Sequence, residues 1–239
     1  MTRDRVLVWD GCVNVRDLGG LPLEGGGETR YGVIVRADSI RTLTREGWQA
    51  LLDYGVRSAI DLRAADELAA DDPRIEAPIP VVHAPLAPSN LDWPSMRDGY
   101  QGLLESARQQ FVESIRLLSG AETPVVVHCQ GGRDRTGLVV ALALALAGVD
   151  YETIAADHAL SDESWAPYLD AFYAEAETES ERERRRRITA PAGRTMAEIL
   201  EELGRRYGGV RRYLTDGGAL EEDLDRIVLR LRGDSPDGQ

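Results

Sequence analysis

The chain has 239 residues, with 41 acidic and 28 basic side chains and a formal net charge of −13. This composition is that of an ordinary globular protein, and the length suits one large domain or two small ones. The negative charge argues against a nucleic acid or an anionic membrane as partner, because the field of the protein would repel both. Every basic residue is arginine, so a lysine nucleophile or Schiff base is excluded.

The number of cysteines and the length of the apolar segments indicate where in the cell the protein is located. The two cysteines, Cys12 and Cys129, cannot form a disulfide framework, and with three scattered histidines they argue against a structural zinc site. The N-terminus lacks the apolar core of a signal peptide, and the longest apolar run, 138–147, is about half the length that spans a bilayer. We therefore expect a cytoplasmic protein without a metal or cofactor and without stable membrane insertion, and secretion without a signal peptide stays open.

The first 150 residues alternate short apolar strands with helical patterns. The predicted strands are 5–9, 31–35, 56–60, 79–83 and 125–128. The predicted helices are 44–54, 99–118 and 136–147. Alternation at this spacing is typical of βαβ units, so the sequence predicts an α/β fold with a mainly parallel central sheet flanked by helices.

After Asp150 the pattern is helical throughout. We predict one domain over 1–232, with an α/β core at about 5–150, a helical part at about 150–232 and a disordered tail at 233–239. Thr195 and Glu198 have the spacing of a capping box for a helix that ends at Gly208. The dense run of Glu and Arg at 175–187 is either a solvated, salt-bridged helix face or part of a mobile lid.

The segment His128-Cys129-Gln130-Gly131-Gly132-Arg133-Asp134-Arg135-Thr136-Gly137 carries the chemistry. A cysteine followed six positions later by an arginine is a weak signal by spacing alone. Here, however, the pair lies in a glycine-rich loop between a buried strand and an apolar helix. That placement favours a loop that folds around an anion at a helix N-terminus.

The placement of these side chains indicates phosphoryl transfer to sulfur. The helix N-terminus and successive loop amides attract an anion, and the Arg135 fork can hold two phosphate oxygens. The same positive field favours the thiolate form of Cys129, which would attack in line and form a phosphocysteine. Thr136 is placed to hydrogen-bond the sulfur as it leaves. The predicted phosphate-binding residues are Gln130, Gly131, Gly132, Arg133, Asp134 and Arg135.

Three further segments support a family assignment: 14–20 (Asn-Val-Arg-Asp-Leu-Gly-Gly), 36–39 (Arg-Ala-Asp-Ser) and 61–63 (Asp-Leu-Arg). With the loop, they resemble a bacterial tyrosine phosphatase family over most of residues 6–160. The resemblance implies a cysteine-dependent phosphatase fold, no metal cofactor, and activity on phosphotyrosine with tolerance of phosphoserine, phosphothreonine and phosphoinositides. Arg133 stands where a lysine is usual in this family. The helical region after Asp150 looks shorter than in the family's best-known member, so we expect its two-helix lid to be reduced here.

The reaction also needs a proton for the leaving group, and two aspartates compete for that role. Asp134 lies inside the loop, close to any bound phosphate, whereas Asp61 ends a strand at the carboxyl edge of the sheet. We favour Asp134, because proximity comes before acidity in choosing a general acid. Arg16 and Asp17 either pin a turn or border the site, and His128 is expected to order the loop rather than act as a base.

Other functions stay open at this stage. A phosphoinositide or inositol-phosphate phosphatase is the main alternative, since Arg133-Asp134-Arg135 resembles the loop endings of lipid phosphatases. A rhodanese-like sulfurtransferase also uses a loop cysteine but does not need Arg135 followed by Thr136. A non-catalytic phosphate-binding module has no use for a thiolate. The sequence gives no oligomeric state.

Overall fold

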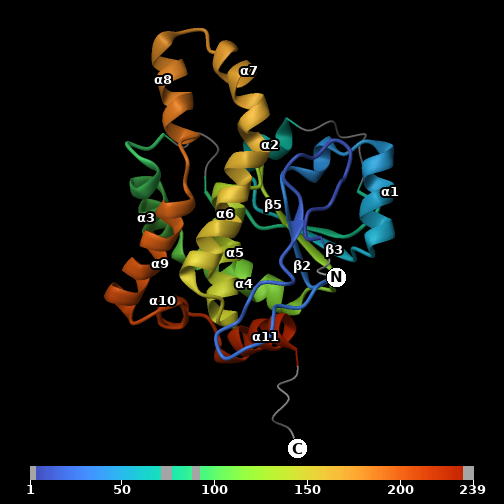
Figure 1. Ribbon diagram of the computed structural model, residues 1–239, viewed down its shortest axis with the longest axis vertical. Coiled ribbons are helices and arrows are strands. Elements are labelled where there is room, and N and C mark those ends of the chain that lie inside the picture. Colours follow the sequence, from blue (N-terminus) through green and yellow to red (C-terminus); the bar gives the residue numbers. More distant parts are fainter. Residues whose placement is uncertain (1–3, 71–76, 88–91, 234–239) are drawn as a thin grey trace, which may run out of the picture.

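The computed structural model describes residues 4–70, 77–87 and 92–233. At its centre lies a five-stranded sheet in the order β1-β2-β5-β3-β4 (Figure 1). Its strands are β1 Arg16–Asp17, β2 Ile34–Ala37, β3 Ser58–Asp61, β4 Val81–His83 and β5 Val125–His128. Only the pairing of β1 with β2 is antiparallel; β2, β5, β3 and β4 run parallel. The mainly parallel α/β fold predicted from the sequence is therefore confirmed.

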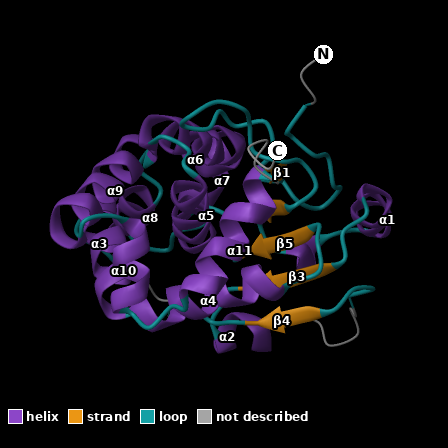
Figure 2. Cartoon of the chain, turned by 90° about the horizontal axis from the view of Figure 1, so that it is seen from below, coloured by secondary structure: helices purple, strands orange, loops and turns teal. Residues whose placement is uncertain are grey.

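Helices cover both faces of the sheet, unequally. On one face α1 (Arg45–Tyr54) packs with the 3₁₀ helix η1 (Ile40–Thr42), whereas α4 (Arg108–Gly120), α5 (Asp134–Ala147) and α11 (Glu221–Arg232) lie on the other (Figure 2). The remaining helices in the described residues are α2 Ala65–Ala69, α3 Met96–Ser106, α6 Tyr151–Trp165, α7 Leu169–Ala174, α8 Glu179–Ile188, α9 Gly193–Tyr207 and α10 Val210–Asp216, with the 3₁₀ helix η2 Ala166–Tyr168 between α6 and α7. The apolar helix α5 is buried along most of its length, which explains why its sequence lacks a polar face.

Several predicted boundaries are confirmed by capping geometry. The Thr44 side chain accepts a hydrogen bond from the Gly47 amide at 3.1 Å and starts α1. Asp150 does the same for α6 through the Thr153 amide at 2.9 Å. Gly148 ends α5 in the left-handed conformation, with φ of 84°.

Other boundaries differ from the prediction. Residues 5–9 form only an isolated bridge, between Val6 and Arg16 at the sheet edge. The single helix predicted over 99–118 is two helices, because Ala107 leaves helical geometry with φ of −113° and ψ of 26°. Helix α9 begins at Gly193, so Thr195 lies inside the helix and is not its N-cap.

The helical C-terminal part packs on the face that carries α5. Helices α7 and α8 form a hairpin that projects from one end of the molecule (Figure 1). Among the residues described, no helix is both long and apolar enough to cross a membrane. Apart from Gly233, the predicted disordered tail lies outside the described residues.

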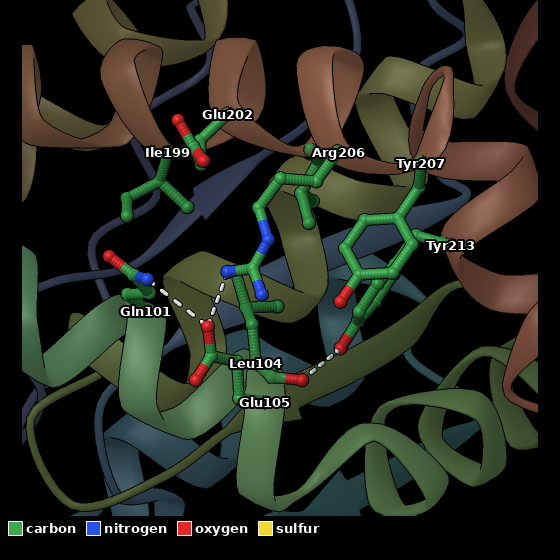
Figure 3. A pocket seen from close by; sticks show the side chains of 9 residues that line it. Gln101, Leu104, Glu105, Ile199, Glu202, Arg206, Tyr207 and Tyr213 are labelled. Atoms are coloured by element: carbon green, nitrogen blue, oxygen red, sulfur yellow. Dashed lines mark hydrogen bonds and ion pairs between the residues drawn. The ribbon is translucent and has the colours of Figure 1, made fainter.

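A small pocket lies between α3, α9 and α10 (Figure 3). Arg206 on α9 reaches across it to Glu105 on α3, and the Tyr213 hydroxyl donates to the Leu104 carbonyl at 2.7 Å. None of the predicted site residues lines this pocket. It therefore belongs to the packing of the helical part and not to the predicted site.

Candidate active site

The cysteine loop joins the end of β5 to the start of α5, as the sequence predicted. Cys129 directly follows the strand and is only 2% exposed. Arg135 and Thr136 lie in the first turn of α5. The thiol therefore lies at the carboxyl edge of the sheet beneath a helix N-terminus, where unpaired amides and the helix dipole attract anions.

Two carbonyl groups of the loop accept hydrogen bonds from side chains of other segments. The Gly131 carbonyl accepts from Asn14 Nδ2 at 3.0 Å and from Trp165 Nε1 at 2.8 Å. The Gly132 carbonyl accepts from the Arg36 guanidinium at 2.9 Å. Because the C=O and N–H of a trans peptide point in opposite directions, the amides that follow these carbonyls face the other side. The Gly132 and Arg133 amides are therefore directed toward the side on which the sequence predicts a bound phosphate.

The loop cannot be built without glycine at position 132. Gly132 has a φ of 63°, and a Cβ at this position would lie 2.4 Å from the Ala37 carbonyl oxygen at the end of β2. A side chain here would force the loop away from the sheet. This explains the second of the two loop glycines in physical terms.

Arg135 is fixed by a carboxylate that the sequence analysis missed. Its two terminal nitrogens donate to the two oxygens of Glu67 on α2, at 2.5 and 2.8 Å. Burial lowers the pKa of Arg135, but the Glu67 hydrogen bonds and the nearby Cys129 sulfur raise it above its usual value. Glu67 holds one edge of the planar guanidinium, so the Nε edge stays available for a phosphate.

Thr136 has the environment that its predicted role requires. Its hydroxyl is buried, and no residue that the structure describes forms a hydrogen bond with it. A buried hydroxyl without a hydrogen-bond partner costs free energy in the folded state, and a catalytic role is one reason for such a group. A cysteine thiolate at the start of the same loop is a suitable acceptor.

The Arg133 guanidinium is hydrogen-bonded to residues outside the loop. Its guanidinium donates to Asp162 on α6 at 2.7 Å and to the Ile188 carbonyl at the end of α8 at 3.0 Å, and it also binds the Ala190 carbonyl. These contacts tie the loop to the base of the α7–α8 hairpin. In this arrangement the Arg133 guanidinium already donates to these groups, so the backbone amide of Arg133 is the part best placed to contact a bound phosphate.

The two candidate acids have different surroundings. Asp134 is the first residue of α5, its side chain is 28% exposed, and its Oδ1 accepts from the Tyr100 hydroxyl at 2.7 Å. Asp61 is buried and accepts from the backbone and guanidinium of Arg63. Although burial raises the pKa of Asp61, the Arg63 hydrogen bonds and nearby His128 hold it below its usual value. A carboxyl that stays ionised is a poor proton donor at neutral pH.

The residues expected to border the site have different roles in the structure. Arg16 donates to Asn14 Oδ1 at 2.7 Å, which directs the Asn14 amide nitrogen toward the Gly131 carbonyl. Asp17 accepts from the Gly19 and Gly32 amides and pins a turn. His128 is fully buried, with its Nε2 3.7 Å from Asp61.

A buried ionic cluster underlies this support. Asp157 on α6 pairs with Arg16 at 3.1 Å, with Arg36 at 3.0 Å and with Arg5. Burial raises the pKa of Asp157, but the three guanidiniums outweigh it and hold the pKa far below its usual value. The cluster therefore fixes the two arginines that act on the loop, one through Asn14 and one directly.

Comparison with known proteins agrees with this geometry. The tyrosine phosphatase family matches residues 7–233. A tyrosine-protein phosphatase of Nostoc commune is 29% identical over 222 residues, which cover 82% of this chain and 73% of the relative. The triple specificity protein phosphatase PtpB of Mycobacterium tuberculosis is 31% identical over 152 residues, 58% of this chain and 55% of PtpB.

Among solved structures, that of a cysteine-to-serine variant of Pseudomonas aeruginosa TpbA in complex with phosphotyrosine is similar over 84% of this chain and 87% of TpbA. The two are 16% identical, with a TM-score of 0.36. The match over residues 7–233 places the chain in the tyrosine phosphatase family. It is a protein-tyrosine phosphatase of the cysteine-dependent class, as the sequence predicted.

Proposed function

We propose that this phosphatase uses Cys129 as the nucleophile, the loop amides and Arg135 to hold the phosphoryl group, and Asp134 as the general acid. The observation that carries the proposal is the orientation of the loop: three groups behind it bind the Gly131 and Gly132 carbonyls and turn the amides toward a bound anion. An arginine fork held by Glu67 closes the same cradle.

The reaction then has two steps. The Cys129 thiolate attacks phosphorus in line, the P–O bond to tyrosine breaks, and Asp134 gives its proton to the departing phenolate oxygen. In the second step a water molecule loses its proton to the Asp134 carboxylate and attacks phosphorus. The P–S bond breaks, inorganic phosphate leaves, and the Thr136 hydroxyl donates to the released thiolate.

Phosphotyrosine in proteins is the substrate that these contacts favour. A multiply phosphorylated inositol head group needs cationic side chains besides Arg135, and Arg133 is the other one that the loop itself offers. Its guanidinium is instead bound to Asp162 and to the Ile188 carbonyl. The net charge of −13 also opposes approach to an anionic membrane. We keep phosphoinositides as the alternative substrate class, and phosphoserine and phosphothreonine as minor ones.

A substrate panel tests this choice. Phosphotyrosine, phosphoserine and phosphothreonine peptides and soluble phosphoinositides are compared by kcat/KM on the wild type, with Cys129→Ser as the inactive control. The proposal predicts the highest kcat/KM for phosphotyrosine peptides. A higher value for a phosphoinositide would reverse the assignment.

A further inference from the structure

A chain of three side chains from three helices ends at the candidate acid. The Tyr100 hydroxyl on α3 lies 2.7 Å from Asp134 Oδ1 and 2.9 Å from His158 Nε2 on α6. The Tyr100 and His158 rings meet edge to face, with centroids 5.7 Å apart. The Tyr100 and His158 side chains are buried, so water does not compete for the hydrogen bond between them.

The directions of the two hydrogen bonds follow from the protonation of the groups. Burial and nearby Asp134 raise the pKa of Tyr100 well above its usual value, so Tyr100 is a neutral phenol with one proton to donate. Burial and the cations Arg36 and Arg133 hold the pKa of His158 far below its usual value, so the imidazole is neutral. A neutral imidazole carries one N–H.

Only one arrangement satisfies both contacts when Asp134 is ionised. Tyr100 donates its proton to Asp134 Oδ1, and the phenol oxygen accepts the N–H of His158 Nε2. The other imidazole nitrogen, Nδ1, then bears no proton, and it is a buried atom without a hydrogen-bond partner among the residues described. Gly137 makes room for this ring, because a Cβ there would lie 2.5 Å from His158 Nδ1.

We propose that His158 and Tyr100 are positioning residues that hold Asp134 so that its transferable proton resides on Oδ2. The inference rests on the proposed role of Asp134 as general acid. With Oδ1 occupied as an acceptor from Tyr100, a protonated Asp134 carries its proton on the other oxygen. None of the described residues hydrogen-bonds Oδ2, and the side chain is 28% exposed, so that proton can reach a leaving group.

Tyr100→Phe tests the chain, with Tyr213→Phe as the matched control. Both phenols are buried, and each donates a 2.7 Å hydrogen bond, Tyr213 to the Leu104 carbonyl in the pocket of Figure 3. We expect Tyr100→Phe to lose about tenfold in kcat on an aryl phosphate with a poor leaving group, the effect of one such bond. On a good leaving group we expect a change below about twofold, and Tyr213→Phe should match the wild type on both substrates.

The pH profile provides a readout that a purely structural role would not move. Tyr100 donates to the carboxylate form of Asp134, so its removal should shift the alkaline limb of kcat to higher pH. Among the residues described, Arg133 and Arg135 are the charged neighbours of Asp134 in the chain, and Asp162 on α6 acts on Tyr100. These stay in place in Tyr100→Phe, so the shift reports the lost phenol.

A second pair of variants tests the histidine. His158→Gln keeps an N–H donor near the position of Nε2, whereas His158→Leu removes it. If His158 donates to Tyr100 as proposed, His158→Gln should retain most of the activity on the poor leaving group, and His158→Leu should resemble Tyr100→Phe. Equal loss in both histidine variants would overturn the role of His158 as a donor.

Failure of this inference and failure of the proposed acid give different results. If Asp134→Asn loses activity equally on both leaving groups, Asp134 is not the general acid and the proposed function loses that assignment. If Asp134→Asn loses activity only on the poor leaving group but Tyr100→Phe behaves like Tyr213→Phe, only the positioning role of Tyr100 and His158 is overturned. In the Asp134→Asn background, Tyr100→Phe should cause no further loss on the poor leaving group; an additive loss would also contradict it.

Discussion

Arg135 and Glu67, 68 positions apart in the chain, form a two-point ion pair at 2.5 and 2.8 Å. The pair joins the first turn of α5 to the short helix α2 and fixes the plane of the guanidinium. Hydrogen bonds from Arg135 hold the pKa of Glu67 below its usual value despite burial, so the pair stays charged at neutral pH. Glu67 thus orients the phosphate-binding fork without any expected contact with substrate.

Arg135→Lys should lose about 10²–10³ in kcat, because a point charge cannot replace a preorganised fork that stabilises the transition state. Glu67→Gln keeps only one acceptor for that fork and should lose about tenfold, the lower end for a hydrogen bond between charged groups. Steady-state kinetics on an aryl phosphate measures both. Glu105→Gln, which disturbs the Arg206 pair in Figure 3, is the control. An Arg135→Lys enzyme within about threefold of wild type would mean that fork geometry is unimportant.

Arg133 should matter more for the hairpin than for substrate. Arg133→Ala removes the contacts with Asp162, Ile188 and Ala190, so limited proteolysis within 175–187 should become faster. KM for a phosphotyrosine peptide should change by less than about threefold, since no direct contact with substrate is lost. A large rise in KM for a phosphoinositide, with unchanged proteolysis, would instead support the original prediction that this side chain binds phosphate.

The charged run at 175–187 should be cut before other segments. Helix α8 contains no buried residue, and several of its ion pairs join neighbours along the helix, such as Glu179 with Arg182 and Glu181 with Arg185. Outside the helix, Arg187 pairs with Asp92. Few buried contacts imply a low free energy of local opening. If the hairpin also acts as a lid, vanadate should slow the cleavage. Cleavage at the same rate with vanadate would leave a solvated helix face as its only role.

Asp157→Asn should lower the free energy of unfolding at neutral pH by about 3–5 kcal/mol, because it leaves buried arginines without their counter-ion. The pKa of Asp157 is depressed in the fold, so its contribution is complete above the unfolded value of about 3.9 and declines as pH falls below it. Urea unfolding at several pH values measures the difference between variant and wild type. A difference that stayed constant from about pH 7 to pH 3 would contradict the ionic role.

The sequence predicted those parts of the site that lie close together in the chain. Cys129, Arg135 and Thr136 belong to one strand–loop–helix segment, so a local motif and its apolar flanks were enough. Glu67, Tyr100 and His158 reach the loop from three other helices, with separations of 68 positions from Arg135, 34 from Asp134 and 58 from Tyr100. No local pattern marks such contacts.

The same limit explains the errors in the fold. The helical spacing over 99–118 continues through Ala107, where the backbone bends, because side-chain periodicity does not report a local change of backbone angles. The segment 14–20 supports the family resemblance, and from the sequence its Arg16 and Asp17 either pin a turn or border the site. Its Asn14 and Arg16 act on a loop carbonyl more than a hundred positions away, which only the folded chain brings together.

The most direct test of the account is to trap the phosphocysteine. The wild type is mixed with an aryl phosphate, quenched in acid within one turnover, digested and examined by mass spectrometry, with and without EDTA. The account predicts a phosphate adduct on the peptide that carries Cys129, unchanged by EDTA, and no adduct on Cys129→Ser, which should still bind the phosphoester. Turnover by Cys129→Ser at a substantial rate, or an adduct on another residue, would contradict the covalent mechanism.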